Sequence, residues 1–110
     1  MTIQHTSLAN GRWHTFSFCE QMANIGAEVG RGLNWLDKQN EKYSLNAYER
    51  ALELIDFTLD DPKNISRARE LCRLRESLVD FFQGSNEYGS TPALMRRYFD
   101  AFGYAARRDR

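Results

Sequence analysis

One arginine interrupts the apolar face of a predicted helix, which places a charged group where a core residue is expected. At about 100° per residue, Arg75 falls among Leu71, Val79 and Phe82. Because arginine is seldom buried without a partner, we expect a carboxylate beside it. The candidates that would complete a buried polar cluster lie at the margins of neighbouring apolar faces: Glu28, Asp56 and Glu49. Such a cluster is either a structural ion pair or a polar pocket for a small ligand.

Residue types that bind metals or act as nucleophiles are sparse. The two histidines, His5 and His14, precede the first predicted helix, and neither completes the Glu-x-x-His pair of a di-iron bundle. No cysteine or histidine pair has zinc-ligand spacing, and no Gly-x-Ser-x-Gly or phosphate-binding glycine motif occurs. We therefore expect no metal ligand, no cofactor and no catalytic residue, and the sequence favours a protein that is not an enzyme.

The cysteines and the apolar runs bear on the location of the protein. Cys19 and Cys72 both lie within helical patterns, and we expect two buried thiols in a cytoplasmic protein rather than a disulfide. No apolar run approaches the length of a membrane span. Residues 1–13 also lack the basic start and apolar stretch of a signal peptide. These features predict a cytoplasmic chain with no membrane partner.

Charge is balanced over the whole chain but unevenly distributed along it. The 110 residues include 15 basic and 15 acidic side chains, so net charge does not indicate a nucleic-acid or membrane binder. A basic block at 62–75 follows an acidic block at 49–61, and we expect the two to pair across consecutive helices. A second basic group ends the chain: Arg96, Arg97, Arg107, Arg108 and Arg110. Its first four members are candidate nucleic-acid contacts, and the alternative is a solvated helix face.

Four helices must position these groups. Ser17 and Glu20 form the pattern of a capping box, which predicts a first helix over 17–39. Ser44 is the expected N-cap of a second helix that ends before Pro62. The third begins at Asp61 with Pro62, or at Ser66, and ends at Gly84. The fourth begins at Thr91 with Pro92 and has an apolar face that continues to Ala106.

These helices predict the fold class. Each has apolar residues at steps of three and four, whereas no segment alternates as a strand would. Short connections between amphipathic helices favour antiparallel neighbours. We therefore predict an all-α fold, a four-helix up-down bundle over residues 13–110, preceded by a flexible segment at 1–12.

Two features of the first helix concern its neighbours. Gly26 and Gly30 lie one turn apart beside the apolar arc, and we interpret them as a site of close approach by another helix, with a ligand opening as the alternative. Trp35 lies on an otherwise polar face, and Phe57 lies off the apolar stripe of the second helix. Either Trp35 covers the helix end, or it belongs to a candidate interface with a second copy or another protein: Asn24, Arg31, Trp35 and Phe57.

Three segments resemble a family of small uncharacterised prokaryotic helical proteins. They are residues 20–29 (EQMANIGAEV), 70–76 (ELCRLRE) and 98–107 (YFDAFGYAAR), within a resemblance that covers about 13–108. The resemblance implies a helical fold and a microbial origin. The family has no assigned activity, so no residue role is implied.

The sequence supports three hypotheses of function. The first is a helical interaction or regulatory module that self-associates as a homodimer through its first helix and the neighbours of that helix. The second is a nucleic-acid-associated protein that uses arginines of the third and fourth helices. The third is a small-ligand-binding bundle around Arg75 and Glu28.

Overall fold

The fold is described by a computed structural model that covers residues 11–108. Within that range the chain forms helices and their connections, with no strand, so the predicted all-α class is confirmed. The elements in chain order are η1 (Arg12–Thr15), α2 (Phe18–Asp37), α3 (Glu41–Asp60), η2 (Pro62–Arg67), α4 (Ala68–Gln83) and α5 (Pro92–Arg108). Most of the expected flexible segment at 1–12 lies outside the described residues, as do His5 and Arg110. Arg12, the last residue of that segment, belongs to the 3-10 helix η1.

Helix α2 begins at the predicted capping box. The Ser17 hydroxyl accepts a hydrogen bond from the Glu20 backbone N–H at 3.1 Å, and the Glu20 carboxylate accepts one from the Ser17 N–H at 2.9 Å. Two of the N–H groups that a helix start leaves free are thereby paired. The apolar arc that follows is buried at Met22, Ile25 and Val29. The sequence therefore predicted both the start of this helix and its core-facing side correctly.

Helix α3 begins earlier than predicted, and Ser44 is not its N-cap. The Asn40 side chain caps the helix by accepting from the Tyr43 N–H at 3.0 Å. Ser44 is buried inside the first turns, where its hydroxyl donates to the Gly32 carbonyl at 2.9 Å. The short turn between α2 and α3 brings these two helices together, so a residue with capping chemistry serves as a cross-link between them.

The third predicted helix divides into η2 and α4. Of the two predicted caps, Asp61 is the one used, since its carboxylate accepts from the Lys63 N–H at 3.1 Å, and Pro62 occupies the first position of η2. Helix α4 begins at Ala68, and Gly84 is its C-cap as predicted. The basic block therefore starts in a 3-10 turn rather than in a continuous helix.

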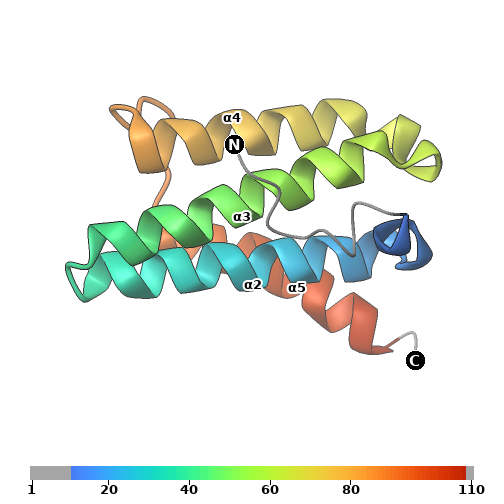
Figure 1. Cartoon of the computed structure of the whole chain (residues 1–110), viewed down its shortest axis with the longest axis horizontal. Coiled ribbons are helices and arrows are strands. Elements are labelled where there is room, and N and C mark those ends of the chain that lie inside the picture. Colours follow the sequence, from blue (N-terminus) through green and yellow to red (C-terminus); the bar gives the residue numbers. More distant parts are fainter. Residues whose placement is uncertain (1–10, 109–110) are drawn as a thin grey trace.

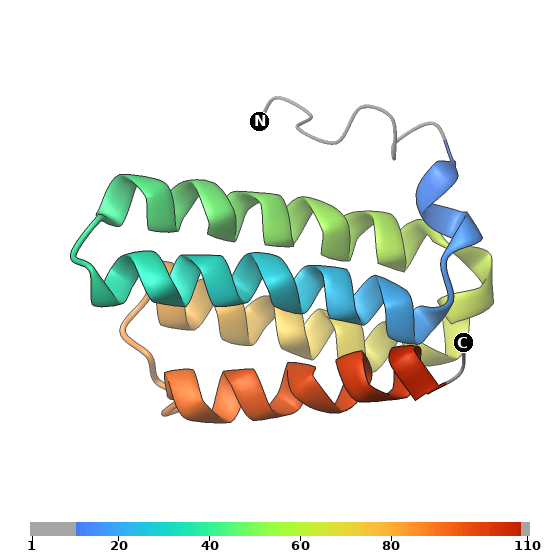
Figure 2. The same ribbon diagram turned by 90° about the horizontal axis from the view of Figure 1, so that it is seen from below.

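The helices pack unevenly. Helix α3 folds back beside α2, α4 lies beside α3, and α5 lies along the other side of α2 (Figures 1 and 2). A Cβ atom at Gly26 would lie 2.6 Å from the Cβ of Phe99, so glycine permits the contact of α2 with α5. Gly30 has no heavy atom within 4 Å of such a Cβ, so the predicted close approach is confirmed for Gly26 and wrong for Gly30. Helices α4 and α5 are not among the closely packed pairs.

Candidate functional site

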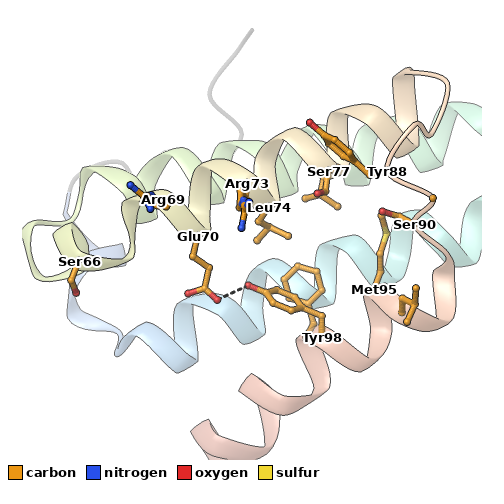
Figure 3. Close-up of a pocket in the computed structure, with 14 residues that line it drawn as sticks. Ser66, Arg69, Glu70, Arg73, Leu74, Ser77, Tyr88, Ser90, Met95 and Tyr98 are labelled. Atoms are coloured by element: carbon orange, nitrogen blue, oxygen red, sulfur yellow. Dashed lines mark hydrogen bonds between the residues drawn. The ribbon is translucent and has the colours of Figure 1, made fainter.

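An open groove lies where α4 and α5 fail to pack together (Figure 3). Its volume is about 600 Å³, within the range of roughly 300 to 1,000 Å³ that is usual for small-molecule sites. Side chains of η2, α4, α5 and the loop between α4 and α5 line it. They include Ser66, Arg69, Glu70, Arg73, Leu74, Ser77, Leu78, Tyr88, Ser90, Leu94, Met95, Tyr98 and Phe99.

The floor of the groove is apolar because two helical stripes meet there. Leu74 and Leu78 are one turn apart on α4, and Met95 and Phe99 are one turn apart on α5. Leu78, Met95 and Phe99 are buried, so the floor is continuous with the core. Leu94 remains 53% exposed at the edge, which leaves apolar surface in contact with water.

A single hydrogen bond crosses the groove between the two helices. The Tyr98 hydroxyl on α5 donates to the Glu70 carboxylate on α4 at 3.0 Å (Figure 3). Arg67 lies 3.5 Å from the other Glu70 oxygen. Burial and the nearby Glu70 charge both raise the pKa of Tyr98 far above its ordinary value. The phenol therefore stays protonated at neutral pH and keeps donating to Glu70.

Two arginines on α4 line the groove without being neutralised. Arg69 and Arg73 are exposed and one helical turn apart, and within residues 11–108 neither guanidinium has a hydrogen-bond or ion-pair partner. Glu70 is the lone carboxylate among the lining residues, and its oxygens are already used by Tyr98 and Arg67. The groove thus combines an apolar floor with an excess of positive charge on its α4 side.

The connection between α4 and α5 closes one end of the groove. The Asp80 carboxylate accepts hydrogen bonds from the backbone N–H groups of Glu87 and Tyr88, at 2.9 and 3.0 Å. Asn86 and Ser90 exchange two further bonds, both 2.9 Å long. Asn86 has a φ of 56°, which asparagine tolerates better than most residues. These contacts fix Tyr88 at the end of the groove.

The four residues of the predicted polar cluster do not come together. Arg75 donates to Asp56 at 2.9 Å, as one of the predicted pairings, but its side chain is 36% exposed rather than buried. Glu28 instead binds Arg31 and Arg50, and Glu49 lies half-buried on α3. Helical periodicity placed Arg75 correctly near α3, but it could not show that α4 leaves that face partly open to solvent. The acidic block at 49–61 and the basic block at 62–75 are joined by two ion pairs. One is between Arg75 and Asp56, and the other is between Lys63 and Asp61.

The predicted interface residues are also dispersed. Trp35 packs edge-on against Tyr43 with ring centroids 4.9 Å apart, and Lys38 lies over the indole, so Trp35 covers the end of α2. Phe57 packs against the core from the far end of α3. Asn24 donates to the carbonyl of Glu20 one turn earlier, and Arg31 binds Glu28. These four residues thus lie in different local environments and do not form one interface.

The candidate nucleic-acid contacts lie along α5. Arg96 donates to the Asn34 side chain of α2 at 2.7 Å, and it lines, with Arg107 and Asp100, a second hollow of about 730 Å³ between these helices. Arg97 and Arg108 are exposed. The arginines therefore do not form one uninterrupted basic surface.

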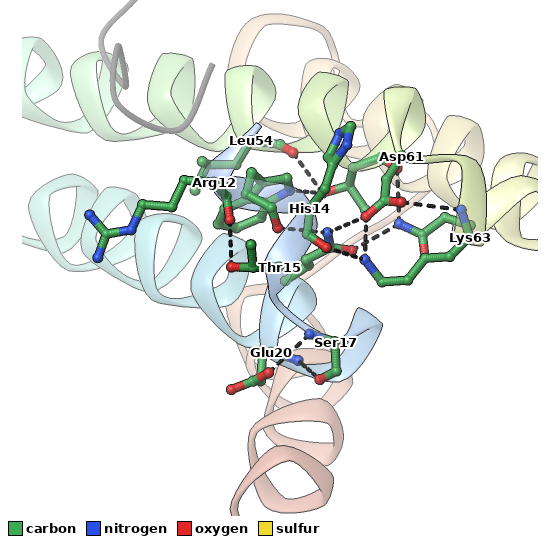
Figure 4. A network of polar contacts seen from close by, with 12 residues as sticks. Arg12, His14, Thr15, Ser17, Glu20, Leu54, Asp61 and Lys63 are labelled. Atoms are coloured by element: carbon green, nitrogen blue, oxygen red, sulfur yellow. Dashed lines mark hydrogen bonds and ion pairs between the residues drawn. The ribbon is translucent and has the colours of Figure 1, made fainter. Parts of the chain in front are cut away.

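A buried polar network between η1, α2, α3 and η2 escaped the sequence analysis (Figure 4). The Trp13 indole N–H donates to the Thr58 hydroxyl at 2.9 Å, and the Gln21 amide donates to the Asp61 carboxylate at 2.9 Å. The Asn64 amide donates to the Gln21 side-chain oxygen at 2.8 Å. The five side chains come from η1, α2, α3 and η2 and its cap, and no local pattern links them.

The charge of Asp61 is stabilised within this network. Burial alone raises the pKa of its carboxyl group, but hydrogen bonds from Lys63 and Gln21 outweigh burial and hold the pKa below its usual value. Among the described residues, no buried side-chain nitrogen or oxygen lacks a partner. The network is therefore saturated, and it offers no free polar group to a ligand.

Two smaller predictions can also be compared with the structure. Cys19 is half-buried, but Cys72 is exposed, so the expectation of two buried thiols is wrong for Cys72. It lies on the solvent side of α4, next to Arg73. Within residues 11–108, no helix has both the length and the apolar composition that crossing a membrane requires.

Comparison with protein-family models, with curated proteins and with solved structures finds no match for this chain. The structure is that of a small helical protein, as the resemblance implied, but the comparisons give the family itself no support.

Proposed function

We propose that this chain is a non-catalytic binding module, and that the groove between α4 and α5 is its binding site. The observation that carries the proposal is the open apolar floor between two helices that are not closely packed along their length. Apolar surface such as that of Leu94 gains stability when a ligand removes it from water. The arrangement supports the predicted up-down bundle in a modified form, with one of its four sides left open.

The other predicted functions have less support. Helix α2 packs against α3 and α5, and the side chains that it leaves exposed are largely polar, among them Asn24, Arg31 and Asn34, so it offers little apolar surface to the predicted homodimer. Arg96, a candidate nucleic-acid contact, is held by Asn34. Self-association, nucleic-acid binding, a cytoplasmic location and a prokaryotic origin all remain predictions from the sequence.

A neutral apolar fluorophore tests the proposed function. N-phenyl-1-naphthylamine becomes brighter in apolar surroundings, and we expect the protein to bind it in the groove. Replacing Leu94 by glutamine should weaken this binding about tenfold, because the variant loses much of a leucine contact. Leu45→Gln is the matched control, since Leu45 is also an exposed helical leucine but lies on α3, away from the groove. Equal binding by both variants would contradict the proposal.

A further inference from the structure

We infer that the groove binds a single-chain anionic amphiphile, such as a long-chain carboxylate, with its head group on Arg69 and Arg73. This inference rests on the proposed function, and it names the chemical class of the ligand. The ligand has two parts, and the groove has a matching region for each.

The charge of the groove favours an anion. Arg69 and Arg73 project from consecutive turns of α4, so their Cβ atoms are about 5 to 6 Å apart. Figure 3 shows the Arg73 guanidinium beside Glu70 and Leu74, at the boundary between the polar rim and the apolar floor. Because guanidinium groups bind carboxylates and phosphates through paired hydrogen bonds, two adjacent unpaired arginines suit one such head group.

The neighbouring carboxylate does not oppose this assignment. Glu70 accepts a hydrogen bond from Tyr98 and lies beside Arg67, so its charge is engaged on the side of α5 and η2. Arg69 and Arg73 have no such partner within residues 11–108. An incoming anion would therefore complete the charge pairing of the groove without displacing an existing ion pair.

The shape of the groove favours a thin chain over a helix of a partner protein. The hydrogen bond between Tyr98 and Glu70 bridges α4 and α5, so a helix about 10 Å wide with its side chains would have to break this bond to lie along the whole floor. The hydrogen-bonded loop that holds Tyr88 and Ser90 also closes one end. A thin acyl chain can lie beside the bond and end at the loop.

The length of the groove separates the head group from the tail. Along α4, Arg69 lies nine residues before Leu78, a distance of about 14 Å. A chain whose head group binds Arg69 and Arg73 would therefore lie over Leu74 and reach Leu78 and Met95 near the closed end. The polar and apolar parts of the ligand are thus placed in a fixed order.

Displacement of N-phenyl-1-naphthylamine by three dodecyl compounds tests the inference, at concentrations below micelle formation. We expect dodecanoate to displace the fluorophore about tenfold more effectively than neutral dodecanol, and dodecyltrimethylammonium to be the weakest. The variant Arg69→Gln/Arg73→Gln should remove the advantage of dodecanoate. The control Arg12→Gln/Arg97→Gln should retain it, because it loses the same charge at exposed arginines outside the groove.

The outcomes separate this inference from the proposed function. If the dodecyl compounds displace the fluorophore equally, or if both double variants behave alike, the groove binds apolar molecules but the anionic ligand is wrong. If neither the fluorophore nor any dodecyl compound binds, both proposals fail. If an acidic amphipathic peptide of leucine and glutamate displaces the fluorophore and dodecanoate does not, the ligand is a protein segment and the inference is overturned.

Discussion

Two regions of this molecule treat polar side chains in opposite ways. At the Trp13 end, a network of neutral and charged groups is buried and every donor has an acceptor. In the groove between α4 and α5, apolar surface is open to water and two arginines have no partner within residues 11–108. Both regions contain charged residues, so charge alone does not distinguish a structural site from a binding site.

The difference lies in whether the interactions are completed inside the chain. A saturated buried network fixes several segments relative to one another and loses stability when any member is removed. An incomplete site adds little to stability, but it leaves interactions for another molecule to complete. The comparison therefore predicts large stability effects at the Trp13 end and small ones in the groove.

The largest effect should come from the buried tryptophan. Trp13 is 1% exposed, and Trp13→Ala should lower the free energy of unfolding by about 3 to 5 kcal/mol, since it removes a large core side chain and leaves Thr58 without its donor. Trp35→Ala serves as the control and should cost under about 2 kcal/mol, because Trp35 is only half-buried. Urea unfolding followed by circular dichroism measures both. Equal losses would remove the distinction between these two sites.

The next effect concerns the charge of Asp61. Asp61→Ala should cost about 2 to 3 kcal/mol at neutral pH, because the carboxylate accepts hydrogen bonds from Gln21 and Lys63. Folding lowers the pKa of Asp61 below its ordinary value of 3.8, so the folded state takes up this proton less readily than the unfolded chain does. The stabilisation is therefore present above about pH 4 and is lost as the pH falls further.

Thermal unfolding of the wild type and Asp61→Ala over a range of pH checks this effect. The difference between the two proteins should shrink as the solution is acidified. A difference that stays constant from neutral pH to strongly acidic pH would show that the charge of Asp61 is not what stabilises the network.

Two glycines on α2 should respond in opposite directions to the same substitution. Gly26→Ala should cost about 1 to 3 kcal/mol, because the added methyl group overlaps Phe99 and forces α5 to shift. Gly30→Ala should add up to about 1 kcal/mol, since alanine favours the helix and meets no atom within 4 Å. Chemical unfolding measures both, and effects of the same sign would contradict the described contact of α2 with α5.

The smallest effect is expected in the groove. Tyr98→Phe removes the hydrogen bond to Glu70 and should cost no more than about 1.5 kcal/mol, because water can replace the phenol at a half-buried carboxylate. Thr58→Val replaces a hydroxyl of the saturated network by a methyl group of similar size, and it should lower the free energy of unfolding more than Tyr98→Phe does. Comparison of the two by urea unfolding sharpens the contrast between the regions, and a larger loss at Tyr98 would reverse it.

The fold class and most helix boundaries could be predicted because their signals are local. The Ser17 and Glu20 box, Asp61 with Pro62, and Gly84 each act within a few residues of the chain. Ser44 shows where such reasoning fails. Its local chemistry suits an N-cap, but packing of α3 against α2 assigns its hydroxyl to the Gly32 carbonyl.

The candidate site could be predicted less well because it depends on distances between helices. Apolar residues recur at steps of three and four in both helices, and Leu74, Leu78, Met95 and Phe99 are among them. Periodicity gives the face of a helix, but it does not show that α4 and α5 stay apart. The polar network was missed for the same reason, since Trp13 is 45 residues from Thr58, and Gln21 is 43 residues from Asn64.

The hydrogen bonds of Asp80 have a further consequence for the groove. They tie the closed end to α4, whereas the contact between Gly26 and Phe99 ties α5 to α2. The length and the width of the groove are thus determined by different residues on different helices. Changes at position 26 would alter how thick a molecule can enter, and changes at position 80 would alter how far it can extend.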